Sequence, residues 1–360
     1  MNKEDVKYIK RTLSLARRAL GHTSPNPMVG AVLVKAGRVI AEDYHRKPGT
    51  PHAEALVLEQ AGPRAKGATL YVSLEPCCHR KKRTPPCTKA IIAAGVKRVV
   101  VAMEDPNPQV SGKGLRELKK AGIEVVSGIM QDQARTLNEA YIKHITTGEP
   151  FVTLKIAMTL DGKIALPTGE SKWITGERAR RLVHRMRAAS DAILTAIGTV
   201  KADNPRLTAR LKGAKSPVRV VIDPGLETPP DANILDIPPR TILVTRRKNN
   251  ERTRPYREKG ADFIYYPEEL DMKWLMKELG SRQITSVMIE GGSSLSAHAL
   301  HDGVVDKVVF FIAPKIICGR DSYPATGGRA CPSLKDAYRL RDLRVRRVGD
   351  DLMVEGYVVK

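Results

Sequence analysis

The sequence predicts an α/β protein of two domains. Its 360 residues exceed the length of one typical domain, which is about 100 to 200 residues. Short apolar runs of strand length alternate with amphipathic segments of helix length, a pattern typical of sheets that carry helices on their faces. A polar break at residues 146–150 separates the halves. We therefore expect domains over residues 1–146 and 150–360.

The first half begins with an amphipathic helix and a hairpin. Apolar residues at helical spacing predict a helix over 5–20, and Gly21 follows it as a cap. Two apolar runs joined by Lys35-Ala36-Gly37 predict a hairpin of strands 28–34 and 38–42. The remaining pattern predicts helices over 53–61, 87–94, 113–121 and 132–143, and strands over 68–74, 97–102 and 124–126. Such alternation favours a mixed sheet with helices on both faces.

The second half repeats the alternation. We expect Thr175 to cap a basic helix over 177–188. The predicted strands cover 151–156, 191–197, 219–222, 241–245, 262–265 and 286–289, with a helix over 271–279. Strand 305–312 and a terminal hairpin of strands 343–348 and 352–359 close the sheet. Glycines after strand 286–289 could admit a phosphate at a helix N-terminus, or form a simple tight turn.

Composition limits the classes of partner. The net charge of +22 suits nucleic acid or small anionic substrates, but aromatic residues make up only 4%, so stacking platforms for single strands are scarce. No apolar run is long enough to span a membrane and no signal core follows the charged start of the chain, so we expect no membrane partner and a cytoplasmic protein. Clustered cysteines suit metal binding in a reducing compartment.

One stretch carries the pattern of a catalytic zinc site. His52 is followed two residues later by Glu54, and Pro76-Cys77 and Pro86-Cys87 come after them. One histidine and two thiolates leave a zinc ion one open position for water, and a glutamate beside them can move protons. A closed structural site, with Cys78 or His79 as fourth ligand, is the alternative.

These motifs also carry a family resemblance. The segments Asn26-Pro27-Met28-Val29-Gly30, His52-Ala53-Glu54, Leu74-Glu75-Pro76-Cys77, Thr84-Pro85-Pro86-Cys87 and Asp105-Pro106-Asn107-Pro108 resemble the deaminase half of the bifunctional riboflavin biosynthesis deaminase/reductases. The resemblance implies a three-layer cytidine-deaminase-like fold with His52, Cys77 and Cys87 as zinc ligands and Glu54 as the proton shuttle. It also implies that the substrate contacts are Asn26, His45, His79 and Arg83.

Two positions depart from that family pattern. Cys78 stands where the family usually has serine, and the loop Arg80-Lys81-Lys82-Arg83 is one residue longer. Adjacent residues rarely reach one tetrahedral ion together, so we interpret Cys78 as a small buried thiol and keep Cys77 as the ligand.

The second half resembles the reductase half of the same family. The resemblance rests on residues 154–163, Ser171-Lys172-Trp173-Ile174-Thr175, residues 198–205 and Glu290-Gly291-Gly292-Ser293. It implies a dihydrofolate-reductase-like fold and NADPH-dependent reduction of a ribosyl group to ribityl. The implied NADPH contacts are Ala157, Trp173, Thr199, Asp203, Gly291, Gly292 and Ser293. The implied substrate contacts are Ser171, Arg187, Leu207, Arg210 and Glu290.

The leading hypothesis is therefore an enzyme that uses Zn²⁺ and NADPH to deaminate and then reduce a small phosphorylated pyrimidine, without nucleic acid as a ligand and as a homo-oligomer. Two alternatives stay open. One is a nucleoside or RNA base deaminase whose basic second domain binds RNA, and the other is a non-enzymatic binding protein that zinc stabilises.

Overall fold

The computed structural model describes residues 2–78, 85–236, 238–248 and 250–359. The chain forms two compact units, Met1–Gly148 and Glu149–Lys360. No helix among the described residues has the length and apolar character needed to cross a bilayer.

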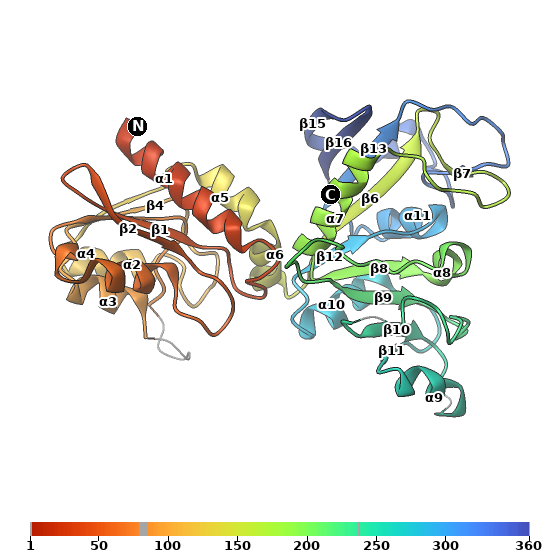
Figure 1. The fold of residues 1–360 in the computed structure, drawn as a ribbon, viewed down its shortest axis with the longest axis horizontal. Helices are drawn as coiled ribbons and strands as arrows, with labels where there is room; N and C mark the ends of the chain where they lie inside the picture. The colour runs from red at the N-terminus through yellow and green to blue at the C-terminus, as the bar shows by residue number, and fades with distance from the viewer. Residues whose placement is uncertain (1, 79–84, 237, 249, 360) are drawn as a thin grey trace. The chain divides into compact units, whose positions relative to one another are not determined.

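The first unit is a five-stranded mixed sheet with helices on both faces (Figure 1). Its strands lie in the order β2-β1-β3-β4-β5. The helices are α1 (Lys3–Ala16), α2 (Ala53–Ala61), α3 (Cys87–Ala93), α4 (Lys113–Lys120), α5 (Gln131–Leu137) and α6 (Glu139–Thr147), and the strands are β1 (Gly30–Lys35), β2 (Arg38–Tyr44), β3 (Thr69–Val72), β4 (Arg98–Val101) and β5 (Glu124–Ser127). Helices α1 and α5 lie on one face of the sheet, and α2, α3 and α4 lie on the other.

Strand direction brings four separate segments to one edge of this sheet. Strand β3 runs parallel to β4 and antiparallel to β1, which is antiparallel to β2. The residues that precede β1 and those that follow β2, β3 and β4 therefore lie along the same edge. Residues 26–29, 45–52, 73–78 and 102–107 meet there, and these ranges contain most of the predicted deaminase residues.

The long helix predicted over 132–143 is wrong, because two helices meet at Asn138. This residue leaves helical geometry, with φ −108° and ψ 22°. Its side-chain amide exchanges two hydrogen bonds with the backbone of Met28, at 2.8 and 3.1 Å. An asparagine that pairs with another segment in this way ends one helix and begins the next.

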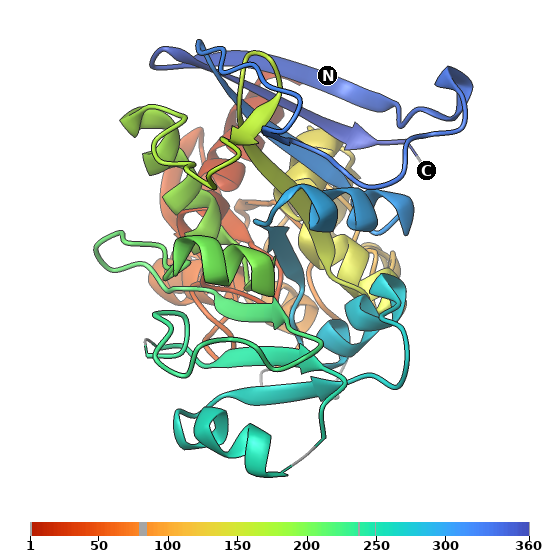
Figure 2. The same cartoon turned by 90° about the vertical axis from the view of Figure 1, so that its right-hand side faces the viewer.

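The second unit is built on a nine-stranded sheet, in the order β11-β10-β9-β8-β12-β6-β13-β16-β15 (Figure 2). The first seven strands in that order are parallel to one another, β16 pairs antiparallel with β13, and β15 pairs antiparallel with β16. The bounds are β6 (Phe151–Thr159), β8 (Ala192–Ala196), β9 (Val218–Ile222), β10 (Thr241–Thr245), β11 (Asp262–Tyr265), β12 (Ser286–Ile289), β13 (Lys307–Ala313), β15 (Leu340–Val348) and β16 (Asp351–Val358). Strands β7 (Lys163–Ala165) and β14 (Tyr323–Pro324) pair separately.

Alternating side chains divide the core of this unit between the two faces of the sheet. Leu194 and Val220 pack with α10 (Met272–Ser281) and α11 (Ser293–His301), whereas Ile193 and Val221 pack with α8 (Ile197–Asp203) and α9 (Asn250–Glu258). Because neighbouring residues of a strand point to opposite faces, strands with apolar residues at every position require helices on both sides.

Thr175 is not the cap of α7 (Glu177–Ala189), so that prediction is wrong. Gly176 occupies the cap position with an extended backbone. Its N–H donates to Oδ2 of Asp351 at 2.8 Å, so a carboxylate from the C-terminal hairpin holds the start of the helix, and no side chain caps its first turn.

Candidate functional site

Three side chains in the first unit converge on one point. Nδ1 of His52 lies 3.6 Å from Sγ of Cys77 and 3.4 Å from Sγ of Cys87. The three ligand atoms all lie within 4.8 Å of one another. A tetrahedral zinc ion, with bonds of about 2.1 Å to nitrogen and about 2.3 Å to sulfur, separates such atoms by about 3.6 Å. The three residues predicted as ligands therefore fit a zinc ion.

The surrounding elements favour charged sulfur. Cys87 is the first residue of α3, and its backbone N–H donates to Sγ of Cys77 at 3.4 Å. The N-terminus of a helix carries partial positive charge, which favours thiolate over thiol. His52 occupies the position just before α2 without a capping hydrogen bond from its side chain, and Glu54 follows in the first turn.

Glu54 faces the metal-binding group without belonging to it. Its side chain is 3% exposed, and Oε2 has no hydrogen-bond partner among the described residues. Burial raises the pKa of this carboxyl, while the nearby His52 acts in the opposite direction. A buried carboxylate oxygen without a hydrogen-bond partner lowers the stability of the fold. The same oxygen is free to accept a proton from a reacting water.

Asn26 and His45, both predicted to contact substrate, form a pair. Nδ2 of Asn26 lies 3.2 Å from Nε2 of His45, whose Nδ1 lies 3.1 Å from the carbonyl of Pro51. Because a carbonyl only accepts, Nδ1 carries the hydrogen and Nε2 accepts from the amide of Asn26. Burial lowers the pKa of His45 and favours this neutral form.

Glu75 was not predicted as a site residue, but it connects two loops at the metal site. Its carboxylate accepts four backbone N–H groups, from Asp105, Gly112, Gly114 and Leu115, at 2.9 to 3.2 Å. The sequence offered one signal, the position of Glu75 beside Pro76-Cys77. It did not show which backbone groups the side chain would reach.

The other residues predicted for the first unit are His79, Arg83 and Cys78. His79 and Arg83 lie outside the described residues, as does the whole loop Arg80–Arg83. Cys78 is partly exposed rather than buried, so that detail of the prediction is wrong. Among the described residues Cys78 does not belong to the metal-binding group.

The second unit contains a cavity of 1270 Å³ at the carboxyl ends of β6, β8 and β12. All twelve residues predicted for the reductase half line it: Ala157, Ser171, Trp173, Arg187, Thr199, Asp203, Leu207, Arg210, Glu290, Gly291, Gly292 and Ser293. Pockets for one small ligand have volumes of about 300 to 1,000 Å³, so this cavity is larger than a typical pocket for a single small ligand. Carboxyl ends of parallel strands are the usual place for such ligands.

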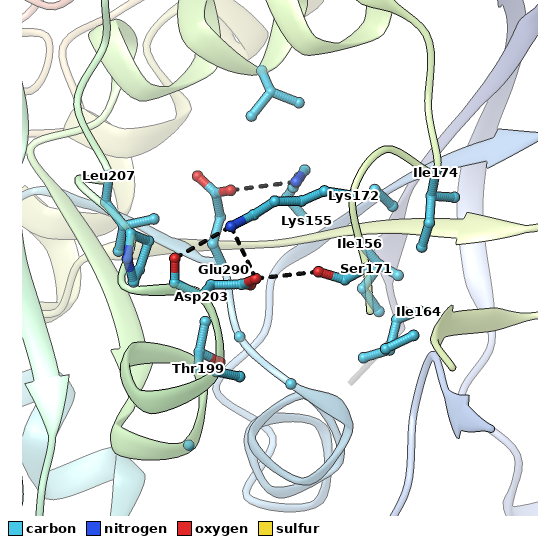
Figure 3. Close-up of a pocket in the computed structure, with 18 of the residues that line it drawn as sticks. Lys155, Ile156, Ile164, Ser171, Lys172, Ile174, Thr199, Asp203, Leu207 and Glu290 are labelled. Atoms are coloured by element: carbon cyan, nitrogen blue, oxygen red, sulfur yellow. Dashed lines mark hydrogen bonds and ion pairs between the residues drawn. The ribbon is translucent and has the colours of Figure 1, made fainter. Parts of the chain in front are cut away.

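Glu290 forms a buried charge cluster in this cavity. It accepts two hydrogen bonds from Arg187, at 2.7 and 2.9 Å, and one from Lys155 at 3.3 Å. Burial alone would raise the pKa of Glu290, but Lys155 and Arg187 lower it to about 2. The carboxylate therefore stays charged and can accept hydrogen bonds from sugar hydroxyls. Figure 3 shows Glu290 and Lys155 facing each other.

A second cluster surrounds Asp203. Its Oδ1 accepts from the hydroxyl of Ser171 at 3.2 Å and lies 3.3 Å from Nζ of Lys172 (Figure 3). Thr199 lies one helical turn earlier on α8. These contacts bring predicted cofactor residues and the predicted substrate residue Ser171 to one wall of the cavity.

Basic side chains form another part of the lining. Arg206 and His184 join the predicted Arg187 and Arg210 there. Burial lowers the pKa of Arg210, and the neighbouring Arg187 and Arg206 lower it further. No carboxylate among the described residues pairs with Arg210, so an anionic ligand would relieve this repulsion.

The basic cavity residues that the sequence did not predict are Lys155, Lys172, Arg180, His184 and Arg206. Lys155 lies on a strand and His184 on a basic helix, where a lysine or histidine gives no signal. The one available clue for His184 was its spacing three residues before Arg187, which places both on one face of a helix.

The turn after β12 leads directly into α11. Gly292 occupies the cap position of this helix and has no side chain to cover the first N–H groups. Oγ of the next residue, Ser293, is buried without a partner among the described residues. Together these groups can bind the phosphates of a dinucleotide.

Two protein families match this chain. The family described as the cytidine and deoxycytidylate deaminase zinc-binding region matches residues 2–103. The family described as the RibD C-terminal domain matches residues 150–354. The second match favours a reductase over an RNA-binding domain in this half of the chain.

Similar proteins match along nearly the whole chain. Riboflavin biosynthesis protein RibD of Aquifex aeolicus is 45% identical over 351 residues, which are 97% of each chain. RibD of Escherichia coli is 41% identical over 362 residues, 97% of this chain and 98% of that protein. The solved structure of Acinetobacter baumannii RibD is 38% identical, with a TM-score of 0.91 and 99% of each chain covered.

Proposed function

Because this chain belongs to the RibD family of bifunctional riboflavin biosynthesis enzymes, with a zinc-dependent deaminase and an NADPH-dependent reductase in one chain, we propose which of its residues perform each reaction. The deaminase domain is residues 1–146 and the reductase domain is residues 150–360. The division of the chain at Gly148 supports these bounds.

In the deaminase domain, His52, Cys77 and Cys87 hold zinc and Glu54 moves the protons. The observation that carries this proposal is the buried, unpartnered Oε2 of Glu54 beside three converging ligand atoms. Bound zinc would supply a water of lowered pKa. Glu54 would take a proton from the water whose oxygen bonds to the ring carbon and deliver it to the amino group on that carbon, so that the C–N bond breaks, ammonia departs and a carbonyl remains.

The substrate of this domain is a diaminopyrimidinone that carries a ribose phosphate. Asn26 and His45 would bind its ring, and His79 and Arg83 would add contacts from the loop outside the described residues. The hydrogen bond from Asn26 to His45 supports the first pair, because it fixes the direction in which the amide oxygen of Asn26 points.

A Glu54→Gln variant tests the deaminase assignment. Glutamine keeps the shape of glutamate but cannot take a proton, so we expect ammonia release to fall by about 10²- to 10⁴-fold. Zinc content, measured by inductively coupled plasma mass spectrometry, should remain that of the wild type. A zinc-loaded variant that releases ammonia at the wild-type rate would contradict the assigned role.

In the reductase domain, Ala157, Trp173, Thr199, Asp203 and the turn Gly291-Gly292-Ser293 hold NADPH. Ser171, Arg187, Leu207, Arg210 and Glu290 hold the substrate. Bound NADPH would supply the hydride. The charged Glu290 would accept hydrogen bonds from the ribose hydroxyls, and Arg210 would bind the phosphate and relieve the repulsion among its neighbouring arginines.

The enzyme acts as a homo-oligomer in the cytoplasm. The edge strand β15 supports the first point, because Leu343 and Val345 are 57% and 60% exposed on it. Light scattering after size-exclusion chromatography tests the oligomer, and a monomeric mass at assay concentration would contradict it.

The cytoplasmic location is supported by the cysteines. The described cysteines form no disulfide, which suits a reducing compartment.

A further inference from the structure

One face of helix α7 forms part of the reductase cavity. Arg180, Val183, His184 and Arg187 recur at helical spacing and all line it. Arg187 already pairs with Glu290, whereas His184 has no role in the proposed function. Nδ1 of His184 lies 3.3 Å from the carbonyl of Thr208, and Nη1 of Arg187 lies 3.3 Å from the same oxygen.

Thr208 lies in a short loop with an unfavourable backbone. Leu207 on one side has φ 49°, and Arg210 on the other has φ 51°. Side chains with a Cβ rarely adopt this left-handed region, at a cost of about 1 to 2 kcal/mol per residue. Such a conformation persists only where surrounding contacts hold it. Both strained residues are the ones assigned to substrate binding.

The contacts around Thr208 fix the tautomer of His184. Because the carbonyl of Thr208 only accepts, Nδ1 of His184 carries the hydrogen. Burial lowers the pKa of His184, and Arg187 and Arg210 lower it further, while the hydrogen bond to Thr208 and the nearby Glu290 act in the opposite direction. The ring is therefore neutral at neutral pH. It donates from Nδ1 to Thr208 in either protonation state.

We propose that His184 is a positioning residue of the reductase, whose Nδ1–H holds the carbonyl of Thr208 and so keeps Leu207 and Arg210 in the backbone conformation that presents them to the substrate. This inference rests on the substrate role proposed for Leu207 and Arg210. It adds a residue that acts through the loop and not by contact with the reacting atoms.

Two variants of His184 separate the donor from the rest of the ring. Asparagine places an N–H donor near the position of Nδ1, whereas glutamine places its amide near Nε2. We expect His184→Gln to lower kcat/KM for the pyrimidine substrate about five- to tenfold through KM, the size of one lost hydrogen bond. His184→Asn should recover to within about twofold of the wild type. KM for NADPH should stay unchanged in both.

The controls distinguish the possible failures. Arg185→Gln, on the exposed side of the same helix, should behave as the wild type. If Arg210→Ala leaves KM for the pyrimidine unchanged, the proposed substrate role fails. If Arg210→Ala raises KM and His184→Gln does not, the inference about His184 is overturned. Equal losses in His184→Asn and His184→Gln would also overturn it.

A spectroscopic measurement on the wild-type protein tests the donor role of His184 without a kinetic comparison. Long-range ¹⁵N–¹H spectra of histidine-labelled full-length enzyme report which ring nitrogen carries hydrogen. We expect His184, assigned by its absence in His184→Asn, as the neutral Nδ1–H tautomer. A neutral Nε2–H tautomer would contradict the donor role.

Discussion

At the scale of single residues, buried carboxylates differ in what holds them. Glu75 accepts four backbone N–H groups. Asp105, at the same edge of the sheet, accepts from the N–H of Asn107 and the hydroxyl of Tyr141, both at 2.9 Å and both on Oδ1. Asp105 is buried, and fewer hydrogen bonds offset the cost of burying its charge than at Glu75.

The pKa of Asp105 gives a prediction about stability and pH. Burial raises this pKa from 3.8 to about 6. A raised carboxyl pKa favours the folded state below the unfolded pKa, and this contribution is lost as pH rises through about 6. Asparagine keeps the accepting Oδ1 without the charge. Asp105→Asn should therefore match the wild type near pH 4 and exceed it by up to about 3 kcal/mol at pH 8.

Differential scanning fluorimetry of both full-length proteins between pH 4 and pH 8 measures this difference. Comparing the two at each pH cancels the titration of other groups. A difference in melting temperature that does not grow with pH would contradict the assigned pKa.

Cys77 and Cys78 give a second prediction at this scale. Only Cys77 has its sulfur among the converging ligand atoms, and burial raises the pKa of the Cys78 thiol. Cys78→Ser should keep one zinc per chain and most deaminase activity, whereas Cys77→Ser should lose both. Zinc content after dialysis against a weak chelator measures this, and zinc loss in Cys78→Ser would refute the assignment.

Single residues also show what the sequence could predict. The motif predicted that His52, Cys77 and Cys87 would converge, with Glu54 close to them, because residue type and short spacing together restrict the chemistry. Glu75 was missed, since its four partners come from residues 105–115 and only the fold brings them within reach. His184 was missed because a histidine on a basic helix resembles a solvated one.

At the scale of elements, the close contact between α4 and the loop after β3 depends on one glycine. A Cβ at Gly114 would lie 2.2 Å from the carbonyl oxygen of Pro76, and 3.1 Å from Oε1 of Glu75. Backbone atoms cannot move aside as flexible side chains can, so Gly114→Ala must displace α4 from the loop that carries Cys77.

We expect Gly114→Ala to destabilise the protein by about 2 to 4 kcal/mol and to weaken zinc binding. Lys120→Ala, at the exposed end of the same helix, is the control and should change neither property. Thermal denaturation and zinc titration measure both effects. A Gly114→Ala protein with wild-type stability and zinc affinity would show that α4 does not hold the metal loop.

Element boundaries were predictable where the pattern was local. Helix 53–61 and strands 241–245, 262–265 and 286–289 agree with the structure in both bounds. The helix predicted over 132–143 and the cap at Thr175 were wrong because distant groups decide them, the backbone of Met28 in one case and Asp351 in the other. Helix α9, rich in charge and containing Pro255, gave no helical pattern to detect.

At the scale of the whole molecule, two chemistries are carried by two separately folded units. Each unit has its own sheet and its own core. The metal-binding group belongs to the first and the large cavity to the second. A variant in one site should therefore leave the chemistry of the other intact.

The coupled assay of Glu54→Gln tests this account most directly. With the diaminopyrimidinone as substrate, the wild type should release ammonia and oxidise NADPH, whereas the zinc-loaded variant should do neither. With the already deaminated pyrimidine, the variant should oxidise NADPH at the wild-type rate. NADPH oxidation by the variant on the diaminopyrimidinone, without ammonia release, would contradict deamination by Glu54 as the required first step.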